Sequence, residues 1–245
     1  MAHGFAASGH GLVLVARSKA KLAALAKTLK AAHGSRVTVL PVDLALAGAA
    51  QALAAALQRK RIAIDVLVNN AGVLEQGAFS AIPAQRHEQL IDLNVSGLTA
   101  MLATFVPSMV ERGFGGVLNV ASIAAFQPVP TLATYAATKA YVLSLTESLA
   151  EELKGSGVTV TALCPGITAA GMLSSAVQAN AQLGELPGFM VGDMDGVAAA
   201  GYAACMRDEV IKMPGSMNLA ATLAARAAPK WLLRRVAGMV SREAL

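Results

Sequence analysis

The 245-residue chain is rich in apolar residues (55%), poor in charged residues (14%) and carries a net charge of +5. This length fits one α/β domain or two small ones, and the composition suits a sheet covered on both faces. Aromatic residues make up only 4% of the chain, too few for the mixture of basic and stacking side chains that favours nucleic-acid binding. We therefore expect no nucleic-acid partner, and binding of an anionic cofactor explains the positive charge better.

No uninterrupted apolar run reaches ~18 residues, so the sequence predicts no membrane-spanning helix. The N-terminus lacks the basic region, apolar core and cleavage site of a signal peptide. The two cysteines, Cys164 and Cys205, suggest a reduced protein without a disulfide framework. These features favour a cytoplasmic location, and no metal site is expected.

Apolar runs typical of buried parallel strands alternate with helical patterns along the chain. Strands are predicted at 11–16, 36–42, 64–69, 116–121 and 158–163, and helices at 19–33, 46–59, 84–112 and 135–154. Residues 1–7 resemble the last turns of a helix that stops at Gly9. This alternation predicts one α/β domain over residues 1–245, with a doubly wound parallel sheet between two helical layers.

The last 80 residues are less regular. Glycines and prolines break residues 168–230 into short pieces, which we expect to lie over the ligand crevice at the carboxyl ends of the strands. Several methionines and leucines there predict either an apolar, adaptable wall or plain core packing. Residues 230–240 read as a basic amphipathic helix that lies on a membrane surface, covers a subunit or is simply solvated.

Tyr135 and Lys139 lie four residues apart in the stretch YAATK, so they share one face of the predicted helix. A neighbouring ammonium favours the phenolate and lowers a tyrosine pKa from about 10, which makes the phenol a usable acid or base near neutral pH. Alone, this spacing also fits a surface tyrosine and lysine. Ser122 adds context, because it follows the strand 116–121 and a hydroxyl there faces the ligand crevice.

Further markers stand at the ends of predicted strands or in adjoining helices. In chain order the set is Asp43-Leu44, NNAG at 69–72, Asn94, Ser122, YAATK at 135–139 and Pro165-Gly166. With these residues in this order, the chain resembles the short-chain dehydrogenase/reductases from residue 1 to about 168. The resemblance implies a Rossmann-like fold and hydride transfer between a nicotinamide cofactor and a ketone or secondary alcohol.

The resemblance also implies catalytic roles for four residues. Tyr135 would be the general acid that protonates the carbonyl oxygen, and Ser122 would hydrogen-bond that oxygen and stabilise its developing charge. Lys139 would lower the tyrosine pKa and bind the nicotinamide ribose. Asn94 would hold a water in the proton relay, unless it caps a helix kink.

For the cofactor, the family pattern maps onto three further groups of residues. Asn70, Ala71 and Gly72 would lie along it, with glycine allowing close approach of the backbone. Asp43 and Leu44 would bracket the adenine, although an aspartate there also suits a helix start. Pro165 and Gly166 would belong to the same cofactor site, and Ile167, just past them, would contact the nicotinamide end.

Ala16, Arg17 and Ser18 end the strand where NAD-preferring members carry an acidic residue for the adenine ribose. An arginine suits a 2′-phosphate instead, through paired, charge-assisted hydrogen bonds. The sequence therefore predicts NADP(H) in preference to NAD(H), unless Arg17 is merely a solvated loop residue.

The family also begins with a strand and a glycine-rich turn, T-G-x-x-x-G-x-G, that cradles the pyrophosphate. Nothing here matches it, and Gly9-His10-Gly11 precedes a strand where the turn must follow one. We expect the first, central strand and this turn to be missing from the present numbering, with unpaired backbone groups that cost about 1–3 kcal/mol each. A mis-set start, a degenerate remnant and another segment filling the gap are the three explanations.

Three functions are therefore compared. The first is an NADP(H)-dependent carbonyl reductase or alcohol dehydrogenase for an apolar substrate. The second is a truncated, inactive binding or assembly protein, and the third is an epimerase or dehydratase, which usually has a longer C-terminal part. The apolar faces of helices 84–112 and 135–154 resemble the dimer bundle of the family, so a homodimer or homotetramer is expected.

Overall fold

The computed structural model describes residues 1–166, 193–216, 218–220, 222, 229 and 235. Within these residues the strands form two parallel sheets. The smaller pairs β1 (Leu12–Ala16) with β2 (Val37–Pro41), and the larger runs in the order β3 (Val66–Asn69), β4 (Gly115–Val120), β5 (Val158–Leu163) and β6 (Ile211–Lys212). Every connection between paired strands is therefore a crossover rather than a hairpin.

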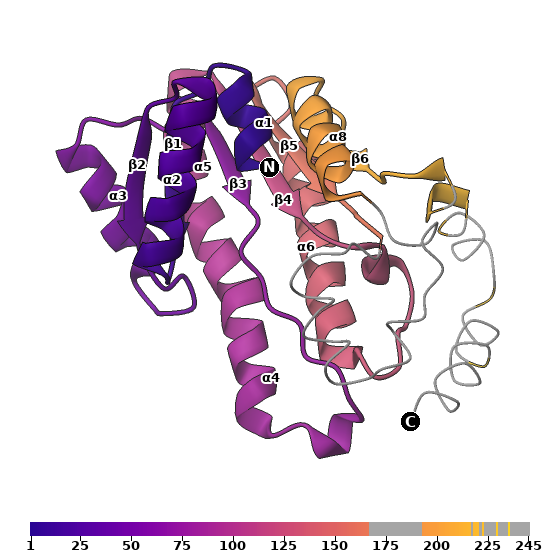
Figure 1. Ribbon diagram of the computed structural model, residues 1–245. Coiled ribbons are helices and arrows are strands. Elements are labelled where there is room, and N and C mark those ends of the chain that lie inside the picture. Colours follow the sequence, from indigo (N-terminus) through magenta and orange to yellow (C-terminus); the bar gives the residue numbers. More distant parts are fainter. Residues whose placement is uncertain (167–192, 217, 221, 223–228, 230–234, 236–245) are drawn as a thin grey trace.

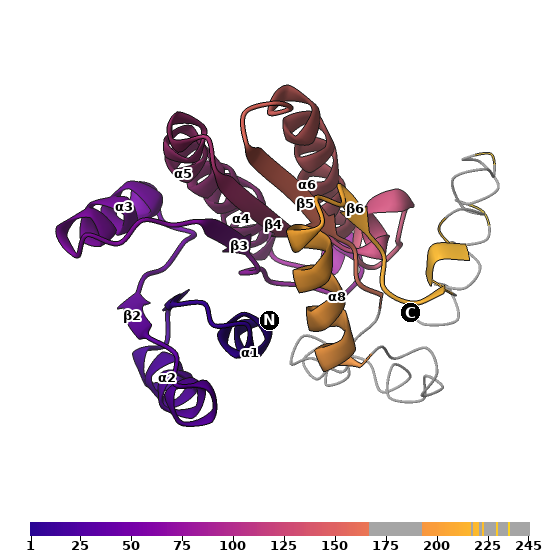
Figure 2. The ribbon, with the colours of Figure 1, turned by 90° about the horizontal axis from the view of Figure 1, so that it is seen from above.

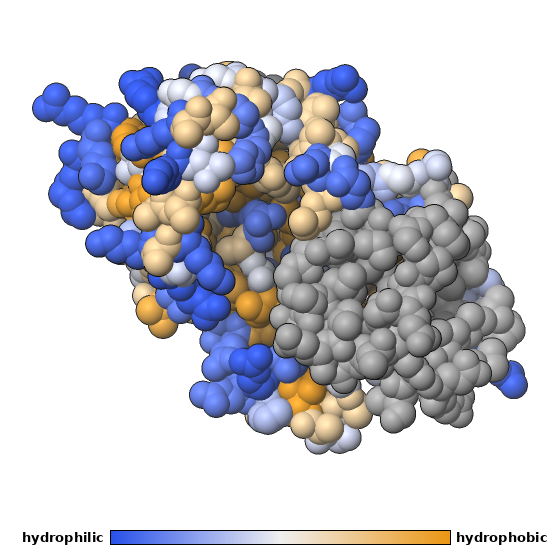
Figure 3. All heavy atoms as spheres, viewed as in Figure 1, coloured by the Kyte–Doolittle hydropathy of each residue, from blue (hydrophilic) through white to orange (hydrophobic). Residues whose placement is uncertain are grey.

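Helices cover both faces of these sheets, as Figure 2 shows from above. One layer holds α1 (Ala2–Ala7), α2 (Lys19–His33) and α8 (Met194–Met206); the other holds α3 (Ala49–Arg59), α5 (Leu98–Arg112) and α6 (Ala133–Glu152). The expected Rossmann-like, three-layer α/β fold is confirmed. Hydrophilic side chains gather on the outside of the α2 and α3 region (Figure 3), as the solvated faces of such helices require.

The strands of the larger sheet are buried on both faces, which is why they read as continuous apolar runs. Val117 on β4 belongs to the core beneath α3, α5 and α6, while its neighbour Leu118 packs on the other face with Leu163 of β5 and Cys205 of α8. Alternate residues of one strand therefore serve two separate cores.

Helix α1 joins the two sheets. Ala6 packs with Leu14 and other residues around the small sheet, whereas Phe5 belongs to the cluster that contains Leu118 and reaches Val66 on β3. In the described residues β1 pairs with β2 and β3 pairs with β4, and no backbone pairing joins β1 to β3. Side-chain packing therefore joins the two sheets, through α1 on one face and through Val13, Val15 and Leu40 against the main core on the other.

The predicted helix 84–112 is one helical run in three parts. It consists of α4 (Ala84–Ile91), a π-helical segment η2 (Asp92–Gly97) and α5. By length and composition this run is apolar enough to cross a membrane, but the apolar side chains of α5, including Met101, Leu102 and Phe105, pack in the core. The π-turn changes the direction in which its side chains point relative to a regular α-helix, and such turns occur frequently at functional sites.

The predicted strands and helices before residue 166 are confirmed, with ends that differ by three residues or fewer. Gly9 ends α1 with a positive φ of 83°, as expected. Within the region 168–230, which we expected to consist of short pieces, the described residues include helix α8 and the short strand β6. Asp193 caps α8 by accepting hydrogen bonds from Asp195 N and Gly196 N. The predicted helix 230–240 lies outside the described residues, apart from Arg235.

Candidate active site

The segments after β3, β4 and β5 leave the larger sheet at one edge (Figure 1), because all three strands are parallel. Ser122 follows β4 and caps the short helix η3 (Ile123–Phe126), where its Oγ accepts a hydrogen bond from Ala124 N at 3.1 Å. The Ser122 side chain is also hydrogen-bonded to the Tyr135 side chain, which comes from the first turns of α6. Both side chains are buried. The structure thus brings the predicted serine and tyrosine together.

The pKa of Tyr135 differs from the expectation. Burial raises it above its ordinary value, and the hydrogen bond with Ser122 pulls it down by a smaller amount. The Lys139 ammonium lies 5.7 Å from the centre of the tyrosine ring, on the face of the ring. In this structure desolvation of the phenolate therefore outweighs the favourable charge that the sequence pattern suggested.

Lys139 is buried and donates a hydrogen bond to the Val120 carbonyl at 2.8 Å. Burial lowers its pKa from 10.5 to about 8, and the nearby Cys164 opposes this effect. A Cβ atom on Gly72 would lie 3.6 Å from Lys139 Nζ and 3.2 Å from Asn94 Oδ1. The absence of a side chain at Gly72 therefore leaves room for the lysine and asparagine to converge.

Asn94 lies in the π-helical segment η2 and is buried. Its Oδ1 accepts from Val73 N and its Nδ2 donates to Val73 O, both at 2.9 Å, and Nδ2 also donates to Thr138 Oγ1 at 3.2 Å. The amide thus ties the turn after β3 to helix α6. Both amide protons are in use, so positioning is the role that the geometry supports most directly.

The remaining nicotinamide-side candidates lie around this cluster. Asn70 and Ala71 are exposed directly after β3. Pro165 follows β5, and its carbonyl accepts a hydrogen bond from Ile123 N at 3.0 Å. A Cβ on Gly166 would lie 2.6 Å from the Asn218 amide, so a side chain there would require that amide to move. Ile167 lies outside the described residues.

The adenine-side candidates lie at the carboxyl ends of β1 and β2. Arg17 is exposed and, among the described residues, makes no hydrogen bond or ion pair. Ser18 caps α2 by accepting from Lys21 N at 3.3 Å. Asp43 accepts from Ala45 N at 3.1 Å in a local turn and is not the cap of α3, which is Gly48.

Sequence reasoning missed a buried polar chain behind the site. Asn69 on β3 donates to Asn119 on β4 at 2.9 Å, and Asn119 donates to Thr146 on α6 at 3.0 Å. It also missed Gly97, where a Cβ would collide with the Leu44 carbonyl. The NNAG motif includes Asn69, but no local sequence pattern indicates that its partner, Asn119, lies 50 residues away.

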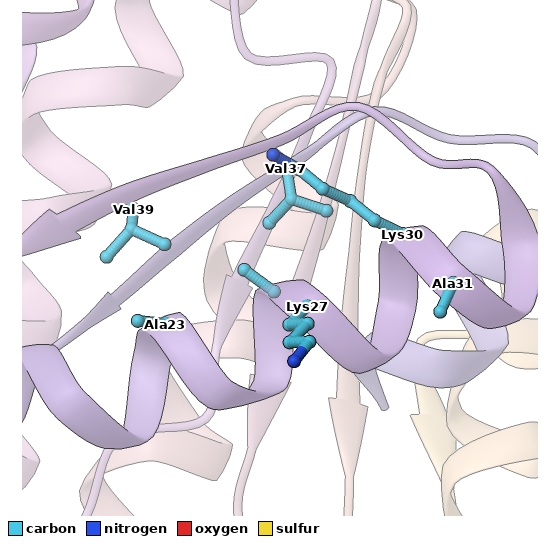
Figure 4. A pocket seen from close by; sticks show the side chains of 7 residues that line it. Ala23, Lys27, Lys30, Ala31, Val37 and Val39 are labelled. Atoms are coloured by element: carbon cyan, nitrogen blue, oxygen red, sulfur yellow. The ribbon is translucent and has the colours of Figure 1, made fainter.

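An open groove between α2 and β2 lies apart from this cluster (Figure 4). It is lined by alanines, two lysines and two valines, namely Ala23, Ala26, Lys27, Lys30, Ala31, Val37 and Val39. None of these residues is a candidate for catalysis or cofactor binding. This groove is therefore not part of the candidate active site.

Comparison with known proteins identifies the class of this site. The family model described as short chain dehydrogenase matches residues 1–181. The chain is 34% identical over 178 residues to 2-(R)-hydroxypropyl-CoM dehydrogenase of Xanthobacter autotrophicus, covering 66% of this chain and 71% of the relative. It is 33% identical over 155 residues to the ketoacyl reductase HetN of a Nostoc species, covering 63% of this chain and about half (54%) of that relative.

Solved structures agree with this class. A short-chain dehydrogenase from Sphingobium yanoikuyae in complex with NADPH matches with a TM-score of 0.79 and 34% identity, covering 92% of this chain and 87% of that one. Another from Burkholderia phymatum in complex with NAD also has a TM-score of 0.79, with 26% identity and coverage of 91% and 86%. The chain belongs to the short-chain dehydrogenase family. Its homologues and structural neighbours are oxidoreductases of this family that act on CH–OH donors.

Proposed function

We propose that this protein interconverts a ketone and a secondary alcohol with NADP(H), using Tyr135 as the general acid and base. One observation supports the proposal most strongly. At the carboxyl ends of the strands, four buried side chains lie close together: Ser122, Tyr135, Lys139 and Asn94. A phenol next to a serine hydroxyl and an ammonium is suited to transferring a proton to an oxygen that gains negative charge.

The residues present fit a nicotinamide cofactor on its ribose side, because Gly72 adds no side chain where Lys139 and Asn94 converge. The cofactor would supply the hydride to the carbonyl carbon. Tyr135 would give its hydroxyl proton to the carbonyl oxygen, and Ser122 would donate a hydrogen bond to the same oxygen. The ammonium of Lys139 would stabilise the phenolate left on Tyr135 and bind the ribose hydroxyls. Oxidation of the alcohol reverses these steps.

Preference for NADP(H) is proposed from Arg17. This guanidinium is exposed at the end of β1, and no described residue pairs with it. An unpaired guanidinium can form two parallel hydrogen bonds to a phosphate. Asp43 and Leu44, at the end of the neighbouring β2, are proposed to bracket the adenine.

We further propose that the active enzyme has one more strand, between β1 and β3, followed by a glycine-rich turn for the pyrophosphate. Within the described residues β1 and β3 are each paired on one side only. They are close enough for Leu12 and Val66 to share a cluster with Phe5. Parallel strands in such positions gain hydrogen bonds from a strand placed between them.

The substrate is proposed to be apolar, because Met213 and other methionines and leucines occur in the chain after β5. A cytoplasmic location is proposed from the two cysteines, which suggest a reduced protein. A homodimer or homotetramer is proposed from the apolar faces of the helices 84–112 and 135–154. Contact of residues 230–240 with a membrane surface is testable by flotation with anionic liposomes.

The test compares the 245-residue chain with a version extended by the codons in frame upstream of Met1. NADPH fluorescence reports cofactor binding, and oxidation of NADPH by aryl and alicyclic ketones reports activity. We expect the extended protein to bind NADPH and reduce at least one ketone. Binding without reduction would contradict the catalytic proposal and favour a binding role. Full activity of the shorter chain would contradict only the proposal of an additional strand.

A further inference from the structure

Two buried threonines on α6 use their hydroxyls in the same way. Thr146 accepts a hydrogen bond from Asn119 and donates to the Val142 carbonyl at 2.7 Å. Thr138, about two turns earlier, accepts from Asn94 at 3.2 Å and donates to the carbonyl of Tyr135 at 2.8 Å. Each threonine therefore connects an asparagine of another element to the backbone of α6, but only Thr138 lies at the candidate active site.

The direction of these hydrogen bonds orients Asn94. A threonine hydroxyl has one proton, and Thr138 gives it to the Tyr135 carbonyl. The hydroxyl can therefore only accept from Asn94, so the NH₂ group of the amide must face α6. The Oδ1 atom then faces the turn after β3, where it accepts from Val73 N at 2.9 Å.

We propose that Thr138 is a positioning residue that aligns the Asn94 amide and thereby holds the turn Ala71–Val73 against the helix that carries Tyr135. This inference rests on the proposed function for its catalytic consequence. The turn includes Gly72, whose missing side chain leaves room for Lys139 and Asn94. A displaced turn would therefore change the space beside Lys139 without removing any group that touches the substrate.

Three variants distinguish the effect of the Thr138 hydroxyl from the effects of side-chain shape and of losing any buried hydroxyl on α6. Thr138→Val keeps the shape of the side chain but removes the hydroxyl, and Thr138→Ser keeps the hydroxyl. Thr146→Val is the matched control, because it removes an equally buried hydroxyl with the same pattern of partners on the same helix. All three variants are made both in the 245-residue chain and in the version extended at its N-terminus.

The first measurement is amide hydrogen exchange of the segment 70–75, which requires neither cofactor nor activity. We expect exchange about tenfold faster in Thr138→Val and within about twofold of wild type in Thr138→Ser and Thr146→Val. The second is ketone reduction, where Thr138→Val should lower kcat about tenfold with the KM for the ketone nearly unchanged. Thr138→Ser should restore kcat.

The two proposals fail in different ways. If Thr138→Val and Thr146→Val have the same exchange in segment 70–75, Thr138 has no special role and the inference is wrong. Failure of Thr138→Ser to restore the wild-type exchange would also overturn it, because bulk rather than the hydroxyl would then matter. If exchange changes as expected but wild type reduces no ketone, the proposed reaction is wrong while the positioning role is supported.

Discussion

Tyr135 and Tyr141 lie on the same helix in different surroundings. Tyr135 is buried against Ser122, whereas Tyr141 is 39% exposed and its hydroxyl lies 2.9 Å from Thr99 Oγ1. Tyr135→Phe should lower kcat by about 10²–10⁴-fold, because it removes the acid that protonates the substrate oxygen. Tyr141→Phe is the matched control and should retain wild-type kcat within about twofold. Steady-state ketone reduction measures both, and equal rates would contradict the assignment.

Lys139 is predicted to reduce stability at neutral pH. Its pKa is about 8 in the folded protein against 10.5 ordinarily, so between these values the unfolded chain binds more protons and the free energy of unfolding rises with pH. The pKa shift corresponds to a destabilisation of about 3 kcal/mol from burying the ammonium. Replacing the lysine would remove this cost but would leave the Val120 carbonyl unpaired, which costs about 1–2 kcal/mol.

Lys139→Met should therefore be inactive but more stable than wild type by about 1–2 kcal/mol at pH 7. This advantage should shrink as pH rises from 8 to 10.5, because wild type gains stability across that window and the variant does not. Urea unfolding at pH 7 and pH 10 measures the difference. An advantage that is the same at both values would contradict the burial argument.

Arg17 offers a test of cofactor preference. Arg17→Ala should raise the KM for NADPH about tenfold or more and leave the KM for NADH within about twofold, because only NADPH has a 2′-phosphate. Lys30→Ala is the control: it removes the same charge in the last turn of α2, at the other end of that helix. A higher kcat/KM with NADH than with NADPH in wild type would end the proposed preference.

The residues of the candidate site were predictable to the extent that they form local motifs. The motifs YAATK and NNAG can be recognised within four or five consecutive residues. The structure brings Tyr135, Ser122, Lys139 and Asn94 together as expected. The pKa of Tyr135 was not predictable, because it depends on burial by chain segments far away in sequence. The role of Thr138 was not predictable from the motif YAATK, since its partner Asn94 is 44 residues away.

At the scale of elements, the π-helical segment η2 packs closely against the loop after β2. A Cβ on Gly97 would collide with the Leu44 carbonyl. Gly97→Ala should therefore destabilise the protein by about 1–3 kcal/mol, despite the better helix propensity of alanine. Gly4→Ala in α1 is the control: a Cβ there meets nothing within 4 Å, so about 0.5–1 kcal/mol of stabilisation is expected. Thermal unfolding measures both, and two changes of the same sign would contradict this packing.

The strands and long helices were predictable because their apolar spacing directly reflects burial. The boundary between α4, η2 and α5 was not, since a π-turn depends on the packing of Gly97 and Asn94 rather than on a break in the helical pattern. Helix α8 was missed because alanines, glycines and methionines give it little polar face to recognise, although Asp193 is an N-cap of the expected kind.

At the scale of the whole molecule, the sequence predicted the three layers but not how α1 would be used. This helix was expected only as the end of a longer one. In the structure Phe5 reaches the core of the larger sheet while Ala6 packs on the smaller. Such packing depends on which surfaces meet across the molecule, and no periodicity within seven residues encodes it.

The packing of α1 has a consequence for cooperativity. Because β1 and β2 share backbone bonds with each other and none with β3 in the described chain, only side-chain packing holds them to the larger sheet. We therefore predict that β1, β2 and α2 open as a unit while the larger sheet remains intact. Native-state amide exchange should resolve two protection levels, with Leu14 exchanging at lower denaturant than Leu118. Phe5→Ala should widen the interval between them, whereas a single shared unfolding isotherm would mean that the two parts melt together.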